Sequence, residues 1–177
     1  EIYRSRPSGD TQVSRDVLSE TNETLAQAAG SLSHIKPDLV VFAHTLGGMF
    51  KGPLYNEELT RMMEHESGSR ALTSATAVVE ALNAMGIRKL SVATPYGPIL
   101  TEIEKEYLQQ EVHGLEIVKD LALDLESPLV VGKLHPDAAY QAAKQADHQA
   151  AEAIFLSGTN WRTIGTIQAL EEDLGKP

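Results

Sequence analysis

Residues 37–48 read PDLVVFAHTLGG, and this segment gives the clearest indication of how the chain folds. The five apolar residues at 39–43 are consecutive, which is typical of a β-strand buried on both faces of a parallel sheet. His44 and Thr45 follow at once, and two glycines come after Leu46. Ligands bind outside the carboxyl ends of strands in parallel α/β sheets, and glycines and free amides at such a turn suit an oxyanion. We therefore favour a binding site here over a Gly-rich turn with an incidental histidine.

Outward from this segment, short apolar runs alternate with longer amphipathic segments, the pattern of βα units around a parallel sheet. The pattern predicts further strands at 89–94, 115–123 and 153–157. It predicts helices at 17–32, 55–66, 73–85, 99–112, 135–147 and 163–174, several of which stop at a glycine. The segment 126–134 is irregular and carries no firm assignment.

The composition is that of a globular protein with a real core, and it excludes several functions. The chain has 177 residues, of which 42% are apolar and 23% are charged. Its formal charge of -10 argues against binding to nucleic acids or anionic membranes. The lack of cysteine excludes disulfides, thiolate metal sites and cysteine nucleophiles. No membrane span or signal peptide is visible, so a cytoplasmic location is expected.

Two further strand ends carry polar groups. Tyr96 follows the predicted strand at 89–94, where its phenol can bind a carboxylate or relay a proton. A tyrosine that only covers the end of the sheet is nearly as good an interpretation. After the strand at 153–157 the chain reads GTNWRT, so a strand enters a helix through hydroxyl, amide and guanidinium donors. Such a helix start attracts anions.

Other candidate residues are weaker. The run Thr73 to Thr76 suits a helix cap, a role more probable for it than contact with a ligand. The remaining histidines show no metal-ligand spacing, so no metal site is predicted. Nucleotide-binding glycine fingerprints are also absent.

Taken together, these segments resemble the maleate isomerase and arylmalonate decarboxylase branch of the aspartate/glutamate racemase superfamily, including its ectoine-utilisation relatives. The similarity covers most of the chain from Pro37 onward, and its motifs occur in the order expected for that branch. They lie at 38–45 with 48–52, at 73–82, at 92–96 and at 155–163.

The resemblance implies an α/β fold of two pseudo-symmetric flavodoxin-like lobes with parallel sheets and the active-site cleft between them. We assign residues 1–73 to the first lobe, joined by 165–177, and residues 74–164 to the second. Residues 1–4 have the pattern of the end of a strand, and 175–177 stop where another strand would begin. We therefore expect the chain to be clipped at both ends and the first lobe to be incomplete.

Enzymes of this branch need no cofactor and use one or two cysteines for proton transfer or covalent attack beside a small carboxylate. In this sequence the two cysteine positions are His44 and Gly158, so both thiols are missing. His44, with an ordinary pKa near 6.5, is then the single candidate acid/base, and Tyr96 is the second catalytic candidate. The resemblance implies that the substrate is bound by Thr45, Leu46, Thr76, Gly158, Thr159 and Asn160.

The leading hypothesis is a cofactor-independent isomerase or lyase that acts on a small mono- or dicarboxylate. The alternative is a non-catalytic carboxylate-binding relative that has lost the cysteine chemistry. A third interpretation is that the thiols were removed by substitution or that the chain is an inactive fragment. Superfamily members often dimerise, so the resemblance also points to a homodimer.

Overall fold

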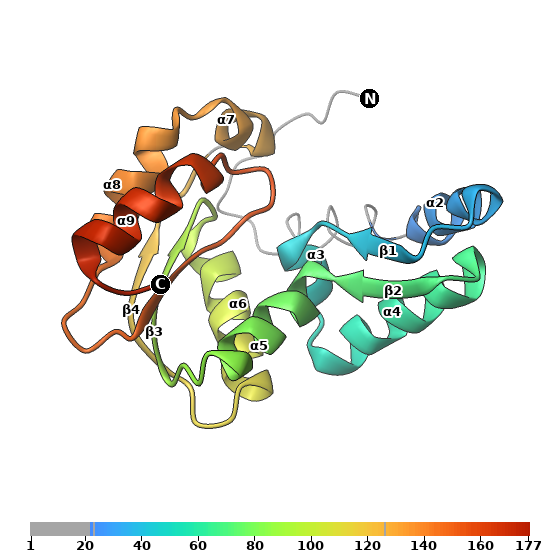
Figure 1. The fold of residues 1–177 in the computed structure, drawn as a ribbon, viewed down its shortest axis with the longest axis horizontal. Helices are drawn as coiled ribbons and strands as arrows, with labels where there is room; N and C mark the ends of the chain where they lie inside the picture. The colour runs from blue at the N-terminus through green and yellow to red at the C-terminus, as the bar shows by residue number, and fades with distance from the viewer. Residues whose placement is uncertain (1–21, 23, 126) are drawn as a thin grey trace.

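A computed structural model describes residue 22, residues 24–125 and residues 127–177. Its strands form two parallel sheets, one with the order β1-β2 and one with the order β4-β3-β5. Helices pack around both sheets (Figure 1). The expected α/β class with parallel sheets is therefore confirmed. The strand predicted at 1–4 and the first part of the helix predicted at 17–32 lie outside the described residues.

The first lobe is built on the two-stranded sheet. It contains α2 (Leu25–Leu32), the 3-10 helix η1 (Ser33–Ile35), β1 (Leu39–Phe42), α3 (Thr45–Met49), α4 (Pro53–Ser67) and β2 (Arg70–Thr73). The strands pair from Leu39 with Arg70 to Phe42 with Thr73. Ala29 of α2, Val40 of β1 and Met63 of α4 form its buried core. The two helices and the sheet thus close a small separate core.

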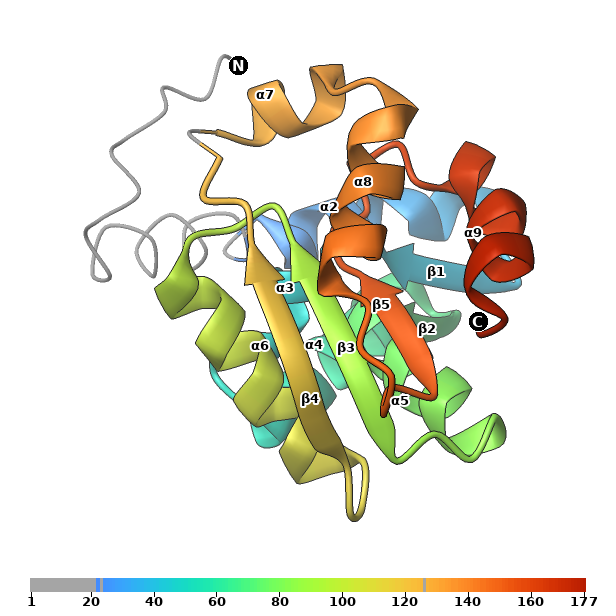
Figure 2. The same cartoon turned by 90° about the vertical axis from the view of Figure 1, so that its left-hand side faces the viewer.

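The second lobe is built on the three-stranded sheet. It contains β3 (Lys89–Thr94), α6 (Pro98–Glu111), β4 (Glu116–Ala122), α7 (Pro128–Lys133), α8 (Pro136–Ala146), β5 (Ala153–Leu156), the 3-10 helix η2 (Ile164–Thr166) and α9 (Ile167–Leu174). The central strand β3 is buried on both faces, as its apolar run predicted. Leu90 and Val92 share a core with α6, whereas Ala93 shares a core with α8. Figure 2 shows these two helices on opposite sides of the sheet.

Helix α5 (Ser74–Ala84) joins the lobes and runs from the end of β2 toward the second sheet (Figure 1). The Thr73 side chain accepts a hydrogen bond from the backbone N–H of Thr76 at 3.1 Å, so Thr73 caps the helix. Ala75 and Leu82 belong to the buried core that includes β3 and α6. The connection between the lobes is therefore a packed helix with its own apolar face.

The segment 165–177, which we expected to join the first lobe, packs on the second. Helix α9 lies against α8, and the carbonyl of Pro177 accepts a hydrogen bond from the N–H of Ile154 at 2.9 Å. The buried face of α9 contains Leu170, which lies beside Ile154 and Leu156 of β5. This apolar face and the free edge of β5 explain the placement.

No helix of the described part of the chain is long and apolar enough to cross a membrane.

Candidate active site

The three strand ends singled out in the sequence lie together in the structure. The Thr159 hydroxyl, after β5, donates a hydrogen bond to the carbonyl of Ala43, after β1, at 2.8 Å. Tyr96, after β3, packs against Leu46 at the start of α3. The Tyr96 hydroxyl also lies 3.5 Å from the position that a Cβ on Gly158 would occupy. The ends of β1, β3 and β5 thus form one junction between the lobes.

His44 stands at the first strand end, just before α3. Its ring meets Phe42 edge to face at a centroid distance of 5.6 Å. The ring also covers Gly47, where an added Cβ would lie 2.4 Å from His44 Nδ1, so glycine is needed there for this ring position. Burial lowers the pKa of His44 because it penalises the charged imidazolium. Burial therefore favours the neutral form of the imidazole.

The predicted substrate-binding residues Thr45, Leu46 and Thr76 have different surroundings. Thr45 and Leu46 are buried in α3, and Thr45 also lines a cavity of about 510 Å³. Thr76, in contrast, is engaged within the protein. Its hydroxyl accepts a hydrogen bond from Asn56 at 2.8 Å and lies 3.1 Å from the hydroxyl of Thr73. This network joins α4 to α5.

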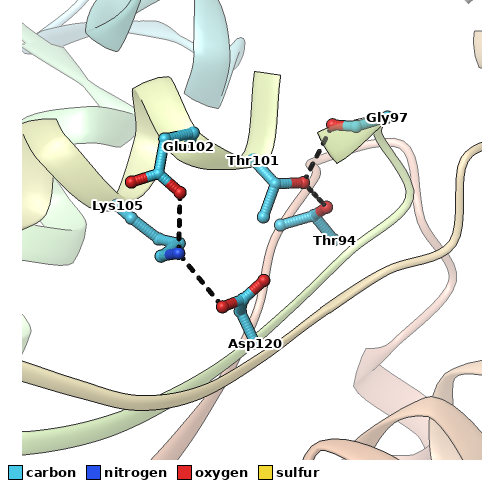
Figure 3. Close-up of polar contacts among 6 residues, drawn as sticks. All are labelled: Thr94, Gly97, Thr101, Glu102, Lys105 and Asp120. Atoms are coloured by element: carbon cyan, nitrogen blue, oxygen red, sulfur yellow. Dashed lines mark hydrogen bonds and ion pairs between the residues drawn. The ribbon is translucent and has the colours of Figure 1, made fainter. Parts of the chain in front are cut away.

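The turn that carries Tyr96 is held by a buried pair of hydroxyls. Thr94, at the end of β3, and Thr101, on α6, are joined by a hydrogen bond of 2.6 Å (Figure 3). The Thr101 hydroxyl also donates to the carbonyl of Gly97 at 3.1 Å. These bonds fix both sides of the turn at 95–97, so the position of Tyr96 is set by strand and helix together.

A second attachment holds α6 to the edge of the sheet. The Lys105 ammonium lies 2.7 Å from Glu102 on the same helix and 3.0 Å from Asp120 on β4 (Figure 3). The Lys105 side chain is 17% exposed and that of Asp120 is 40% exposed, so solvent screens the pair only in part. The pair joins α6 to the edge strand β4.

Gly158 occupies a backbone conformation that suits glycine alone. Its φ is +109°, and a Cβ there would lie 3.4 Å from Pro95 as well as close to the Tyr96 hydroxyl. L-residues rarely adopt such positive φ values. The strand end therefore exposes its backbone beside Tyr96 and provides no side chain at that point.

Directly behind Gly158 lies a buried carboxyl group that sequence reasoning missed. Glu104 on α6 is fully buried, and its Oε2 accepts a hydrogen bond of 2.6 Å from the Ser157 hydroxyl. Burial raises the pKa of Glu104 to about 7, although the bond from Ser157 lowers it in part. A usable signal was present, since Glu104 follows Thr101 by three residues and so lies on the inward face of its helix.

Tyr96 is electrostatically coupled to this carboxyl group. Burial raises the pKa of the Tyr96 phenol first, and the negative charge of Glu104 raises it further. An interaction with the Ser157 side chain offsets part of the effect. Tyr96 is therefore a protonated hydrogen-bond donor at neutral pH, and its pKa depends on the charge of Glu104.

Thr159 and Asn160 use their donors within the protein. Thr159 bonds to Ala43, as described above, and Asn160 donates to the carbonyl of Pro128 at 2.9 Å. The following residue, Trp161, is buried, and its indole N–H has no hydrogen-bond partner among the described residues. The turn after β5 is thus tied to the first lobe on one side and to α7 on the other.

A cavity of about 510 Å³ opens beside this junction, along α5 and the edge of β5. Its walls are mainly apolar, with hydroxyl groups from Thr45, Ser74 and Thr159. Gly158 and Trp161 also line it. His44 and Tyr96 are not among the lining residues, but each is adjacent to one that is. A concave, largely apolar space with a few polar groups is the usual form of a small-molecule site.

In the part of the chain that the structure describes, no three histidine, aspartate or glutamate side chains lie together where they could hold a metal ion.

Comparison with known proteins gives one family. A sequence profile of the arylmalonate decarboxylase family matches residues 5–177. Maleate isomerase of Alcaligenes faecalis is 27% identical, in an alignment that covers 85% of this chain and 61% of that protein. For arylmalonate decarboxylase of Bordetella bronchiseptica the identity is 25%, with coverage of 97% and 68%. The chain thus spans roughly two thirds of the length of these relatives.

Solved structures show the same fold. Nocardia farcinica maleate cis-trans isomerase bound to TRIS superposes with a TM-score of 0.86 at 21% identity, over 99% of this chain and 72% of that one. A liganded double mutant of arylmalonate decarboxylase gives a TM-score of 0.85 at 23% identity, over 90% and 68%. The chain therefore belongs to the arylmalonate decarboxylase family, within the maleate isomerase and arylmalonate decarboxylase branch of the aspartate/glutamate racemase superfamily.

Proposed function

We propose that the chain is a cofactor-independent isomerase or lyase that acts on a small mono- or dicarboxylate, with His44 as its acid/base. One observation carries the proposal: the ends of β1, β3 and β5 meet through Thr159, Tyr96 and Gly158. Parallel sheets bind ligands at such strand ends. We place the active site at this junction, in a cleft between the lobe that ends at residue 73 and the lobe that follows.

The surroundings of the junction suit a small carboxylate with an apolar part. The cavity beside it combines apolar walls with threonine and serine hydroxyls. Tyr96 stays protonated, so it can donate a hydrogen bond to a carboxylate oxygen. A local donor of this kind would hold an anion despite the net charge of -10.

His44 is suited to moving a proton at this site. Its lowered pKa leaves a neutral imidazole, which accepts a proton from a carbon beside a carboxylate. Hydroxyl donors and free amides would stabilise the enediolate that results. Covalent attack at the second strand end is excluded because Gly158 has no side chain.

The second candidate function is a non-catalytic carboxylate-binding protein. The observation in its favour is that neither strand end provides a thiol, whereas a solved mutant of the Nocardia isomerase holds a covalently bound succinylcysteine intermediate. In that case the cavity and Tyr96 would bind the anion and His44 would be idle.

Proton NMR in heavy water separates the two functions. The chain is incubated with maleate, aspartate, glutamate and substituted malonates, and isomerisation, decarboxylation or deuterium incorporation is followed. We expect turnover in the parent chain and in His113→Ala, which changes an exposed histidine, and none in His44→Ala, which should still bind ligand. Line broadening without chemical change would favour the binding protein, and turnover by His44→Ala would exclude the acid/base role.

A further inference from the structure

Glu104 is a buried acid to which the proposed function assigns no task. It lies on α6 with no exposed surface, and Ser157 is its hydrogen-bond partner at 2.6 Å. Its second oxygen, Oε1, is also buried and has no partner among the described residues. An ionisable group is costly to bury without a cation and a complete set of hydrogen bonds. A purely structural residue at this position would therefore be better supplied by an apolar side chain, which would fill the space without the desolvation penalty.

The carboxyl group is connected to the strand-end junction. Ser157 is the last residue before Gly158, the glycine beside the Tyr96 hydroxyl. Tyr96 interacts with both the Ser157 side chain and the charge of Glu104. Glu104 and Ser157 are thus joined by a hydrogen bond, and the Tyr96 hydroxyl lies beside Gly158, the next residue after Ser157, so the three groups follow one another from the core to the junction.

Other charged groups around Glu104 are engaged elsewhere. On α6, Lys105 is paired with Glu102 and with Asp120 of β4. Glu111 of α6 and Glu57 of α4 act instead on Tyr107, whose hydroxyl is buried without a partner. The groups that face Glu104 are therefore Ser157 from the end of β5 and Tyr96 from the turn after β3.

We propose that Glu104 is the second acid/base group of this site, a buried proton store that exchanges a proton with a carbon of the bound substrate through Ser157 and Tyr96. The inference rests on the proposed function and names its substrate class: a carbon acid that loses or gains a proton beside a carboxylate. Glu104 itself does not touch the substrate and acts only through the other two residues.

The proton transfer balances within the site. With its hydroxyl turned from the substrate carboxylate to Ser157, Tyr96 takes a proton from the substrate carbon. Its phenol proton passes to Ser157, and the Ser157 hydroxyl proton passes to an ionised Glu104. The carbon–hydrogen bond breaks, a bond between oxygen and hydrogen forms at Glu104, and the electron pair stays on the substrate as an enediolate. Reversal of the same shifts protonates the enediolate. Tyr96 and Ser157 end each transfer as neutral hydroxyls.

This relay gives the site two ionisable groups although neither cysteine position holds a thiol. His44 comes from the end of β1 in the first lobe, and the relay reaches the junction from β3 and β5 of the second. A proton removed by one group can be replaced by the other, which is what racemisation or isomerisation through an enediolate requires.

Glu104→Gln tests the relay, because glutamine fills the same space and keeps a hydrogen bond to Ser157 but does not store a proton. Glu106→Gln, an exposed residue two positions further along α6, is the matched control for the change in charge. Two quantities are measured: the pH profile of deuterium incorporation into the substrate, and the infrared carbonyl band of a buried carboxylic acid. The infrared band reports on Glu104 without any need for turnover.

We expect the parent chain and Glu106→Gln to show the carboxylic acid band and a rate that changes near the pH at which this band disappears. In Glu104→Gln both features should be lost, with kcat lowered about 100-fold and KM nearly unchanged. Ser157→Ala should lower kcat similarly but keep the band. A band that titrates while the pH profile of Glu104→Gln matches the parent would overturn the relay and leave the proposed function intact. Absence of exchange in the parent chain would overturn the proposed function, and the catalytic relay with it.

Discussion

Gly158 is the residue whose backbone most constrains the site. Its φ of +109° places it where a side chain is strained, and the space above it is bounded by Pro95 and the Tyr96 hydroxyl. Gly158→Ala should therefore lower the free energy of unfolding by about 1–3 kcal/mol. Urea denaturation would show this as a lower midpoint with an unchanged slope. Gly165→Ala is the control, because Gly165 has open space around it and an ordinary φ; equal losses in both variants would contradict the argument.

Tyr96 is expected to contribute one hydrogen bond to the bound carboxylate. Tyr96→Phe keeps the packing against Leu46 but removes the donor, so the binding free energy should weaken by about 1 kcal/mol. Calorimetric titration with maleate measures the difference. Tyr140→Phe removes a hydroxyl that bonds to Asp173 between α8 and α9, and it should leave the affinity unchanged. Unaltered affinity in Tyr96→Phe would remove Tyr96 from the binding site.

At the scale of single residues, the sequence indicated which residues follow the strands, but it did not indicate that α6 places a carboxyl group beside them. His44, Tyr96 and Gly158 follow buried apolar runs, so their place at one edge of the fold could be predicted. Glu104 was missed because its partner, Ser157, is 53 positions away in the chain. A helical pattern shows that Glu104 faces inward, but it does not show which strand end it meets.

At the scale of elements, the contact between α6 and the end of β5 should make stability depend on pH. The pKa of Glu104 is raised from 4.5 to about 7, so the folded state binds this proton more tightly than the unfolded state. The contribution of this proton to stability is fully present below the pKa of Glu104 in the unfolded state. It is lost as the pH rises through the pKa of Glu104 in the folded state. The free energy of unfolding should therefore fall by up to about 3 kcal/mol between about pH 4.5 and about pH 7.

Chemical denaturation across this range measures the effect as a difference between the parent chain and Glu104→Gln. The variant should lack this part of the slope and should be the more stable of the two above neutral pH. Glu106→Gln should follow the parent chain throughout. A parent and a Glu104→Gln variant with parallel pH profiles would mean that Glu104 titrates normally.

Long, periodic elements could be predicted from the sequence, whereas short ones depend on packing that the sequence does not display. The predicted strand at 89–94 is β3 without change, and the other predicted strands and most helices differ by a few residues at their ends. Helix α3 was missed because it contains two glycines, which disfavour helices. It forms because all five of its residues are buried against neighbours. Strand β2 was missed since its four residues begin with an arginine and show no apolar run.

At the scale of the whole molecule, tryptophan fluorescence should report ligand binding at the junction between the lobes. Trp161 is the one tryptophan of the chain, and it lines the cavity two positions after Thr159, which bonds to the first lobe. Binding of a carboxylate in this cavity should change the intensity or wavelength of Trp161 emission. Titration with maleate would show a saturable change. Saturable binding by calorimetry with constant emission would place the ligand outside the cavity.

The arrangement of the lobes depends on packing contacts between residues that are far apart in the sequence. Helix α5 could be predicted as a helix, but its role as the packed link between two sheets depends on Ala75 and Leu82 meeting the second core. The placement of α9 on the second lobe depends likewise on the free edge of β5. Both are consequences of which apolar faces remain uncovered, and periodicity alone does not reveal this.

The missing side chain at Gly158 has a practical consequence for any assay. A chain without cysteine does not react with iodoacetamide and does not lose activity when peroxide oxidises thiols. An isomerase that works through a cysteinyl adduct is inactivated by the same treatment. Alkylation of a preparation before the assay therefore inactivates thiol-dependent contaminants from the expression host and leaves the activity of this protein to be measured without them.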